Sequence, residues 1–296
     1  MIISAKKARS AVAASLLMVC TILSTFSVKT DAASTFKKLF KDYTDKKTVK
    51  TVAGHKVRNG NGNLDIMYSD ETFWRPSSVN NYSPVFSDGT DIYYTDNQQL
   101  MKFNFELYKG ETVFDLAHRD GATNISNSTE YNIAAYNKNK FYINEINYEN
   151  GYKIISYDIE TGETSEIEGA VDDYKGDYLL IDEVYQTYPG NKGYNYLCKF
   201  TDDGITKLKK ISKYRTGMMG YAGKNFYFLE IRDKKNKIFL KTCKPDGSGM
   251  KTLKKFKMGK SGYSLTYKYN KKNLTFTLDH VSYKLTYKNN KVVKTK

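Results

Sequence analysis

The sequence predicts an all-β chain that repeats one antiparallel unit. Two observations carry this prediction. Turns that contain glycine or asparagine recur at nearly constant steps, and an aromatic strand precedes almost every turn. The composition agrees, because 26 tyrosines, 15 phenylalanines and only four prolines favour strands and argue against disorder.

The clearest copy of the unit is residues 223–256. A polar loop at Asp233–Asn236 reverses the chain, and glycines in Asp246-Gly247-Ser248-Gly249 supply the positive φ of a tight turn. Around these reversals the apolar pattern predicts three strands. The strands are Asn225–Ile231, Lys237–Thr242 and one that begins at Met250–Leu253.

Six turns mark the repeat. They are Asn59-Gly60-Asn61-Gly62, Lys109-Gly110, Thr161-Gly162, Asp203-Gly204, Asp246-Gly247 and Asn289-Asn290. Their successive steps, from Gly62 to Asn290, are 48, 52, 42, 43 and 43 residues. Aromatic strands lie upstream of five turns, at Ile92–Tyr94, Phe141–Ile143, Tyr178–Leu180, Phe226–Phe228 and Leu274–Phe276. The unit around Gly62 lacks such a strand and is inferred from the spacing.

Repeats of this length with several strands each are typical of β-propeller blades. Closing the repeats into a ring would remove most exposed strand edges. The sequence therefore predicts a six-bladed β-propeller of four-stranded antiparallel blades, which fills residues 33–296 as a single domain. A solenoid or two stacked β domains would use the same local pattern and are the alternatives.

The first 32 residues are predicted to be a signal peptide. Basic residues at positions 6, 7 and 9 precede an apolar run from Ala11 to Phe26, and small residues at Thr30 and Ala32 suit cleavage after Ala32. The run is too short for a membrane span, which needs about 20 residues. Val19 before Cys20 argues against a lipoprotein. We expect an exported chain with no transmembrane segment, secreted or associated with the cell surface.

The segment Ser34–Tyr43 follows the predicted cleavage site. Its apolar residues have helical spacing and Ser34 is a suitable N-cap, so a short amphipathic helix is one interpretation. A first strand is the other. Downstream, the mature chain keeps Cys198 and Cys243, which occupy similar places in successive repeats and are predicted to be buried, unpaired thiols.

Two blades also carry a resemblance to known families. The run Asp91-Ile92-Tyr93-Tyr94-Thr95-Asp96, followed by Leu100–Asn104, resembles the YWTD-type blade of six-bladed propellers of the low-density lipoprotein receptor kind. Lys244–Gly249 with Leu253 resembles the blade ending of TolB-like propellers and of secreted bacterial propeller domains of unknown function. This resemblance implies a binding platform and assigns no catalytic residue.

Charge is unevenly spread over the chain. The net charge is +4 for residues 1–100, −8 for 101–200 and +19 for 201–296, which together make the +15 of the whole chain. Such asymmetry suggests contact with a polyanion or attraction between parts of the chain. Nucleic acid is a poor candidate, because the chain is expected to be exported and only six of its 47 basic residues are arginines.

The C-terminal basic stretch contains the candidate binding residues. Mobile lysine charges suit phosphate or carboxylate polymers, and tyrosines can stack on sugars. The candidates are Lys251, Lys254, Lys255, Lys257, Lys260, Lys271, Lys272, Tyr263 and Tyr267, with Tyr269 interleaved and Trp74 as the only tryptophan. A solvated lysine-rich face that aids solubility is the alternative interpretation, and Trp74 suits a buried position as well as an exposed one.

No catalytic or metal-binding motif stands out. The three histidines lie in different units, and HExxH, CxxC and GxSxG patterns are absent. His118 and Asp120 are a weak acid–base pair, and Asp172, Asp173 and Asp177, or Asp88 and Asp91, are weak calcium candidates. We therefore expect no cofactor and no metal.

The resulting hypothesis is an exported, monomeric, non-catalytic binding module. Its basic C-terminal blades would contact an anionic cell-envelope polymer or an acidic protein. The alternative is an enzyme that processes a polysaccharide or peptide in the propeller funnel. That alternative requires carboxylates such as Asp177, Asp182 and Glu183 to converge at the axis.

Overall fold

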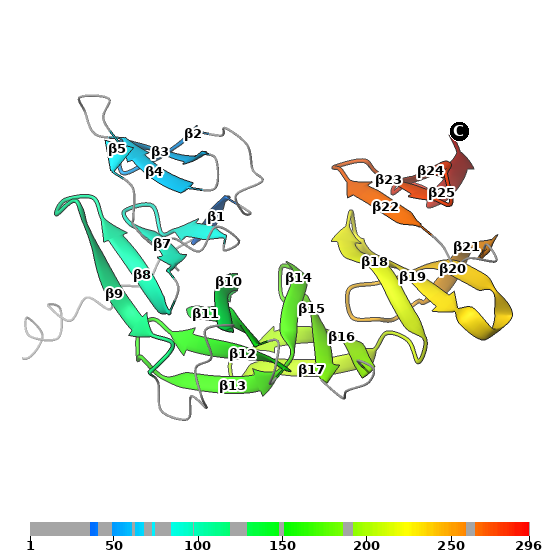
Figure 1. Cartoon of the computed structure of the whole chain (residues 1–296), viewed down its shortest axis with the longest axis horizontal. Coiled ribbons are helices and arrows are strands. Elements are labelled where there is room, and N and C mark those ends of the chain that lie inside the picture. Colours follow the sequence, from blue (N-terminus) through cyan, green and yellow to red (C-terminus); the bar gives the residue numbers. More distant parts are fainter. Residues whose placement is uncertain are drawn as a thin grey trace, which may run out of the picture. The chain divides into compact units, whose positions relative to one another are not determined.

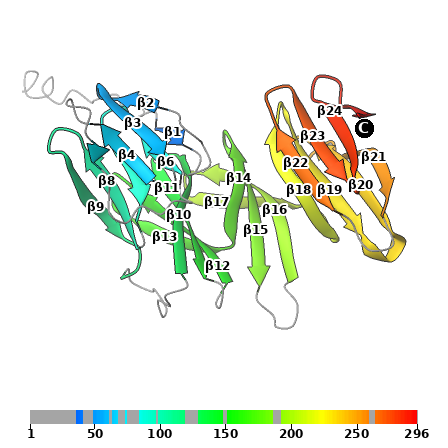
Figure 2. The same cartoon turned by 45° about the horizontal axis from the view of Figure 1, so that its top comes forward.

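Six antiparallel sheets follow one another along the chain in the computed structural model (Figures 1 and 2). The structure describes residues 36–40, 49–60, 63–67, 73–74, 84–96, 98–118, 129–147, 151–185, 192–258 and 264–295. All described strands belong to one compact unit, Lys37–Lys296. The chain is therefore all-β in its described part, and the prediction of six repeated antiparallel units is confirmed.

We number the sheets I to VI by position in the chain. Sheet I is β2 (Val49–Val52), β3 (His55–Gly60), β4 (Asn63–Met67) and β5 (Phe73–Trp74). Sheet II is β1 (Lys37–Phe40), β6 (Val85–Ser87), β7 (Ile92–Thr95), β8 (Gln99–Asn104) and β9 (Lys109–Asp115). Sheet III is β10 (Thr129–Asn137), β11 (Lys140–Asn147), β12 (Gly151–Asp158) and β13 (Thr164–Glu168).

The last three sheets have four strands each. Sheet IV is β14 (Ala170–Lys175), β15 (Tyr178–Tyr185), β16 (Lys192–Thr201) and β17 (Gly204–Lys210). Sheet V is β18 (Arg215–Ala222), β19 (Asn225–Arg232), β20 (Lys237–Cys243) and β21 (Lys251–Lys257), with the 3-10 turn η1 (Asp233–Lys235) between β19 and β20. Sheet VI is β22 (Leu265–Tyr269), β23 (Asn273–Leu278), β24 (Val281–Thr286) and β25 (Lys291–Lys294).

Two details differ from the sequence prediction. Sheet II has a fifth strand, because β1 pairs with β6, so the segment after residue 36 starts as a strand and not as a helix. The connection before Asn63 joins the second and third strands of sheet I, whereas each of the other five predicted turns lies at the last connection of its sheet. Spacing alone placed this turn, because sheet I lacks the aromatic strand that marks the other units.

One aromatic position recurs at the end of the first strand. Tyr136, Tyr174, Tyr221 and Tyr269 each lie opposite the first core residue of the next strand: Phe141, Leu179, Phe226 and Leu274. Sheets III, IV and V also share a register shift in the first strand, between Ile133 and Ala135, Val171 and Asp173, and Gly217 and Gly220. β-bulges increase local twist. These shared details show that sheets III to V are copies of one unit.

Consecutive sheets pack through apolar faces. Val57, Leu64 and Ile66 of sheet I contact Ile92 and Phe103 of sheet II in one buried cluster. Similar clusters join sheet III to IV, IV to V, and V to VI. Sheets II and III meet at the ring pair Phe86–Phe141, whose centroids are 6.1 Å apart. Apolar burial between neighbouring sheets therefore holds the described part of the unit together.

Buried polar contacts fix the same interfaces. The Asn144 side chain of sheet III donates to the Val171 carbonyl at 2.9 Å and accepts from the Val171 amide at 2.8 Å. In the next interface, the Tyr221 amide donates to Asp173 Oδ2 at 2.7 Å. A buried amide or half-buried carboxylate with such partners avoids the cost of an unmet hydrogen bond.

Closure of the six sheets into a ring stays a prediction. Among the described strands, the packing contacts that join sheet V to sheet VI have no counterpart between sheet I and sheet VI. The signal-peptide prediction for residues 1–32 falls outside the described residues. Within the described part, no helix is long and apolar enough to cross a membrane.

Candidate basic surface on sheets V and VI

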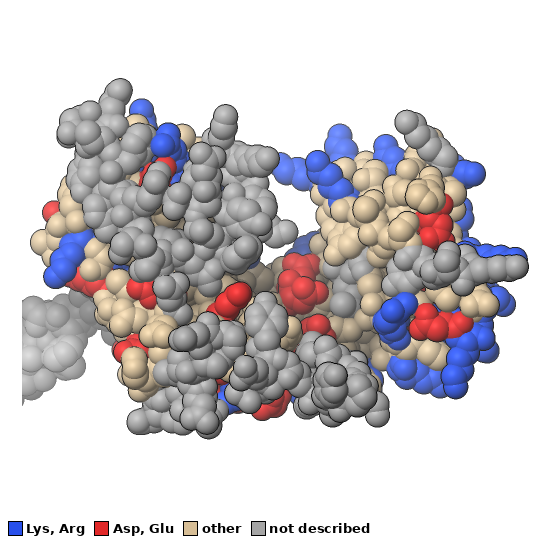
Figure 3. Space-filling view, in the orientation of Figure 1, with Lys and Arg blue, Asp and Glu red and all other residues tan. Residues whose placement is uncertain are grey.

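The structure divides the predicted basic residues among several places. Lys251, Lys254, Lys255 and Lys257 lie on β21, the outermost strand of sheet V, whereas Lys271 and Lys272 lie in the turn between β22 and β23 of sheet VI. Figure 3 shows Lys and Arg side chains gathered over these two sheets. Lys260 and Tyr263 lie outside the described residues. Trp74 pairs with Ile66 through its backbone in sheet I, and its side chain lies outside the described set.

One group of lysines forms where three turns meet. The Tyr287 amide donates to the Lys272 carbonyl at 3.2 Å, which joins the β24–β25 turn to the β22–β23 turn. Tyr227 donates to Asn290 Oδ1 at 2.8 Å, and a Cβ at Gly223 would lie 3.2 Å from Tyr287 Cβ, so the β18–β19 turn adjoins both. These contacts bring together five exposed lysines, the turn cluster: Lys224, Lys271, Lys272, Lys288 and Lys291.

The turn cluster is a purely cationic site. Its three turns contain no Asp or Glu, and their other polar side chains are asparagines such as Asn270 and Asn289. Asn270 Oδ1 accepts the amides of Lys272 and Asn273 at 2.9 and 2.8 Å, which holds the β22–β23 turn in shape. Fixed turns with five ammonium groups and no carboxylate attract anions.

A second group lies at the opposite end of sheet V. We call it the hairpin cluster: Lys234, Lys235, Lys237, Lys255 and Lys257, all exposed. Lys237 and Lys257 are directly opposite each other on β20 and β21, an unfavourable arrangement for like charges. Asp233 is the nearby acid, and it pairs with Arg215 at 3.3 Å. Sequence reasoning missed three members, because only the strand pairing brings β19–β20 turn residues beside β21.

Lys251 and Lys254 belong to neither group. Lys251 pairs with Thr242 at the start of β21, away from Lys257 at its end. Lys254 is half-buried and its ammonium lies 5.1 Å from the ring centre of Tyr283 in sheet VI. A cation over an aromatic face is a stabilising contact, so Lys254 contributes to the V–VI interface.

The two interleaved tyrosines on β22 differ in exposure. Tyr267 is 50% exposed, whereas Tyr269 is half-buried, and a Cβ at Gly220 of sheet V would lie 3.0 Å from its ring. Burial is the main cause that raises the pKa of both phenols. Only Tyr267 is accessible enough to stack on a ligand.

The carboxylates named for an enzyme site are spread along sheet IV. Asp182 accepts from Asn195 at 3.0 Å on one face of β15, while Glu183 pairs with Lys207 on the other. Adjacent residues of a strand point to opposite faces, and Asp177 lies five residues earlier, in the β14–β15 turn. These three carboxylates therefore do not converge on one point.

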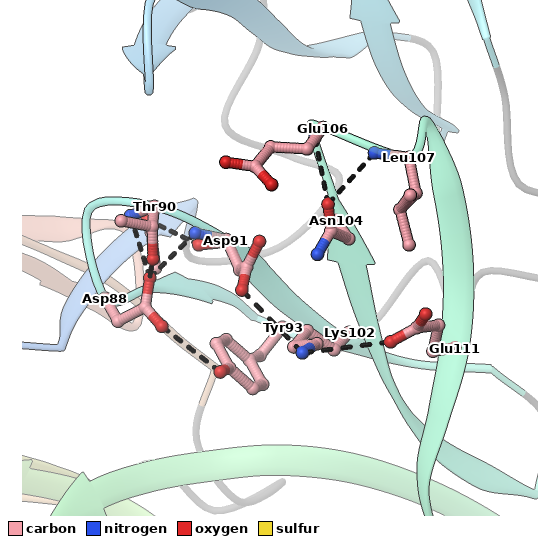
Figure 4. A network of polar contacts seen from close by, with 10 residues as sticks. Asp88, Thr90, Asp91, Tyr93, Lys102, Asn104, Glu106, Leu107 and Glu111 are labelled. Carbon is pink, nitrogen blue, oxygen red and sulfur yellow. Dashed lines mark hydrogen bonds and ion pairs between the residues drawn. The ribbon is translucent and has the colours of Figure 1, made fainter.

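Of the acidic residues considered for calcium, Asp172 and Asp173 lie on β14 and Asp177 in the turn that follows it, whereas Asp88 and Asp91 lie in the turn between β6 and β7. Asp88 Oδ1 accepts the amides of Thr90 and Asp91 at 2.8 and 2.7 Å, and its Oδ2 accepts from Tyr93 (Figure 4). Lys102 lies 3.8 Å from both Asp91 and Glu111. Over the residues that the structure describes, no group of three His, Cys, Asp or Glu is arranged to hold a metal ion.

The histidines and cysteines have local roles. His118 contacts Asp115 at 3.1 Å, and Asp120 lies outside the described residues. Cys198 and Cys243 are buried and unpaired, which confirms the prediction made for them. Burial raises the pKa of the Cys198 thiol to about 12 and that of Cys243 to about 11. Since the thiolate is the reactive form, both thiols are expected to be inert.

These features define an all-β chain of six antiparallel sheets with a lysine-rich C-terminal surface. No family model matches the chain, and no curated protein sequence matches it. Among solved structures, it is similar to a post-proline cleaving enzyme from Rickettsia typhi, with 8% identity, a TM-score of 0.48, and coverage of 84% of this chain and 44% of that one. A dipeptidyl peptidase 4 from Porphyromonas gingivalis gives 10% identity, a TM-score of 0.48, and coverage of 82% and 44%.

A third similarity is to a chain of a nidogen/laminin complex. It has 12% identity and a TM-score of 0.36, and covers 67% of this chain and 74% of that one. The present chain spans less than half the length of the peptidases that it resembles. With TM-scores below 0.5, none of these similarities determines an activity for this chain.

Proposed function

We propose that this protein is a non-catalytic module that binds an anionic polymer through the turn cluster. The observation that carries the proposal is that five exposed lysines lie in or directly beside three adjoining turns of two sheets, with no carboxylate in those turns. Lysine ammonium groups on flexible stems adapt to phosphate, sulfate or carboxylate groups along a chain. The hairpin cluster lies at the other end of sheet V and would form a separate contact.

The wider setting belongs to the same proposal. We place the module outside the cytoplasm, after removal of residues 1–32, as a monomer whose six sheets are blades of the TolB-like or YWTD-like kind. An acidic protein is the second partner class, because its carboxylates would meet the same lysines. The enzyme alternative would need carboxylates other than Asp177, Asp182 and Glu183, which lie on different faces and at different heights of sheet IV.

The test compares two triple variants of equal charge change. We expect Lys271→Gln, Lys272→Gln and Lys288→Gln together to weaken binding of polyphosphate at least tenfold and to flatten its salt dependence, since exposed charge contacts are screened by salt. The matched control, Lys234→Gln, Lys235→Gln and Lys237→Gln, should keep most of the affinity. Binding would be measured by fluorescence anisotropy at two salt concentrations.

Each outcome is informative. Unchanged binding in the first variant and loss in the second would move the site to the hairpin cluster. Equal binding by both variants and the parent, or no binding by the parent to polyphosphate, poly(glycerol phosphate) and polygalacturonate, would refute the proposed function.

A further inference from the structure

Sheet VI has one apolar and one polar face. Leu274, Phe276 and Leu278 of β23 are buried against sheet V. The alternate residues point to the other face, where strand pairing aligns Thr266, Thr277 and Ser282 in one row and Lys268, Thr275 and Lys284 in the next. We call these six residues the hydroxyl face.

The hydroxyl face is open and hollowed. Thr266, Lys268, Thr275 and Lys284 are exposed, and Thr277 and Ser282 are half-buried. A groove of about 350 Å³ lies over this sheet, with Thr266, Lys268, Thr275, Thr277, Ser282 and Thr295 among its lining residues. The groove therefore offers several hydroxyl groups and one ammonium group to a ligand.

The charge of the face is positive throughout. Lys268 and Lys284 lie on either side of Thr275, two strand intervals or roughly 10 Å apart. None of the six residues is acidic, and Asp279, beyond the end of β23, accepts the Ser264 amide at 2.8 Å. Lys271 and Lys272 of the turn cluster follow in the adjoining turn, and Lys291 is the first residue of β25. An anionic chain would meet lysines both within the groove and at its end.

The hydroxyls keep capacity for a ligand. Thr277 and Ser282 share one hydrogen bond of 3.0 Å, and the Thr275 hydroxyl donates to the Lys268 carbonyl at 3.4 Å. A hydroxyl has one proton to donate and two lone pairs, so each of these groups can also pair with a ligand hydroxyl. Lysine only donates and therefore selects the anionic groups.

Ring closure would place sheet I on this face, and ligand binding here requires the face to stay free of it. An apolar sheet is a poor occupant of the face. Covering it with apolar side chains would leave hydroxyls and ammonium groups without water or other hydrogen-bond partners, which is unfavourable. A neutral glycan would leave Lys268 and Lys284 without a counter-charge. A polymer that carries both hydroxyls and negative charges satisfies both sets of groups.

We propose that the hydroxyl face binds an anionic polyol or glycan chain. Lys268 and Lys284 pair with its negative charges, and Thr275, Thr277 and Ser282 form hydrogen bonds with its hydroxyl groups. This inference rests on the proposed function, because it extends the lysine surface of the turn cluster into a groove that recognises both the negative charges and the hydroxyl groups of the polymer.

Four probes separate charge from hydroxyl recognition. Poly(glycerol phosphate) and polygalacturonate carry both features and represent a phosphate and a carboxylate source. Polyphosphate carries charge alone, and dextran carries hydroxyls alone. We expect the full protein to bind the first two at least threefold more tightly than polyphosphate of equal charge, and to bind dextran weakly.

Two double variants test the residues. Lys268→Gln with Lys284→Gln should weaken both hydroxylated polyanions roughly tenfold. Thr275→Val with Thr277→Val removes two hydroxyls but keeps the β-branched shape, and should weaken those two polymers about threefold to tenfold while leaving polyphosphate unchanged. Thr275→Ser with Thr277→Ser keeps the hydroxyls and should retain binding, which controls for altered folding of the sheet.

The outcomes distinguish the two proposals. If the turn-cluster triple variant loses binding but both hydroxyl-face variants bind all probes as the parent does, the proposed function stands and this inference is overturned. An equal effect of the valine variant on polyphosphate and poly(glycerol phosphate) would also overturn it. If the parent binds no polyanion, both proposals fail together.

Discussion

Sheets V and VI share a strand register, but they differ at the face that points away from the preceding sheet of the chain. The register aligns Phe226 of β19 with Leu274 of β23, since each lies opposite the recurring tyrosine of its first strand. By that alignment Tyr227 and Leu229 correspond to Thr275 and Thr277. The first pair is fully buried against sheet VI, whereas Thr275 is exposed.

This difference shows how one repeat serves two environments. β19 is buried on both faces and reads as a nearly continuous apolar run, NFYFLEIR, whereas β23 alternates as NLTFTL. Sheet V has register shifts in two of its strand pairs, and sheet VI has none in its three pairs. The last repeat keeps the packing face of its predecessors and presents a polar face in place of the other.

The largest expected effect comes from truncating a side chain on the face of sheet V that packs against sheet VI. Leu229→Ala should lower the free energy of unfolding by about 2–5 kcal/mol, because it leaves a cavity between two sheets. The matched change Thr277→Ala should stay within about 0.5 kcal/mol, as is usual at surface positions. Urea unfolding followed by circular dichroism measures both. Similar losses would mean that the hydroxyl face is covered in solution.

A smaller effect is expected at a buried charge that sheet VI lacks. Glu230, 4% exposed, accepts from Lys241, Arg232 and Ser212 at 2.6–2.9 Å, and Leu278 takes the aligned place in β23. Burial alone would raise the pKa of Glu230, but these donors hold it below its usual value. Glu230→Gln should therefore cost about 1.5–3 kcal/mol at pH 7.

The pH dependence of this loss has a definite sign. Because the folded-state pKa of Glu230 is lowered, its stabilising contribution is present above the unfolded value of about 4.3 and disappears as the pH falls through the folded value. The difference between parent and Glu230→Gln should thus shrink from pH 7 to pH 3. Leu278→Ala serves as the control, and its loss should be similar at both pH values.

The smallest effect concerns like charges on the edge of sheet V. Lys237→Gln removes the repulsion with Lys257 and should stabilise the protein by about 0.2–1 kcal/mol, more at low salt. Lys284→Gln is the matched change in sheet VI, where the partners Thr275 and Val293 are uncharged, and should give no gain. Thermal unfolding at two salt concentrations compares them. A gain from Lys284→Gln as large as that from Lys237→Gln would contradict this explanation.

Much of the fold was accessible from the sequence because its signals are local. The strands at Phe226–Phe228 and Leu274–Phe276 and the turns at Gly162, Gly204 and Gly247 all appear where predicted. The prediction was less definite where local signals were missing. The second strand of sheet I lacks the aromatic residues that mark the other units. The segment after residue 34 allowed both a helix and a first strand, and the pairing of β1 with β6 shows that the strand is correct.

The candidate site was accessible only in part. Lys255, Lys257, Lys271 and Lys272 belong to the clusters. Lys254 does not, because adjacent strand residues point to opposite faces and it meets Tyr283 of sheet VI, and Lys251 does not, because it lies at the other end of β21. The turn cluster also includes Lys224, Lys288 and Lys291, which lie up to 67 residues apart in the chain. The lysines of these turns could have indicated a shared surface if the turns of successive repeats had first been aligned.

By itself, the sequence determined the all-β class, the repeated unit and the positive C-terminal third, because strand alternation, turn residues and charge are properties of short segments. The tertiary structure decided which lysines share a surface, which carboxylates are paired, and which face of sheet VI is open. Those outcomes depend on contacts between sheets, and contacts between segments more than 40 residues apart leave no mark in the local pattern of a single sequence.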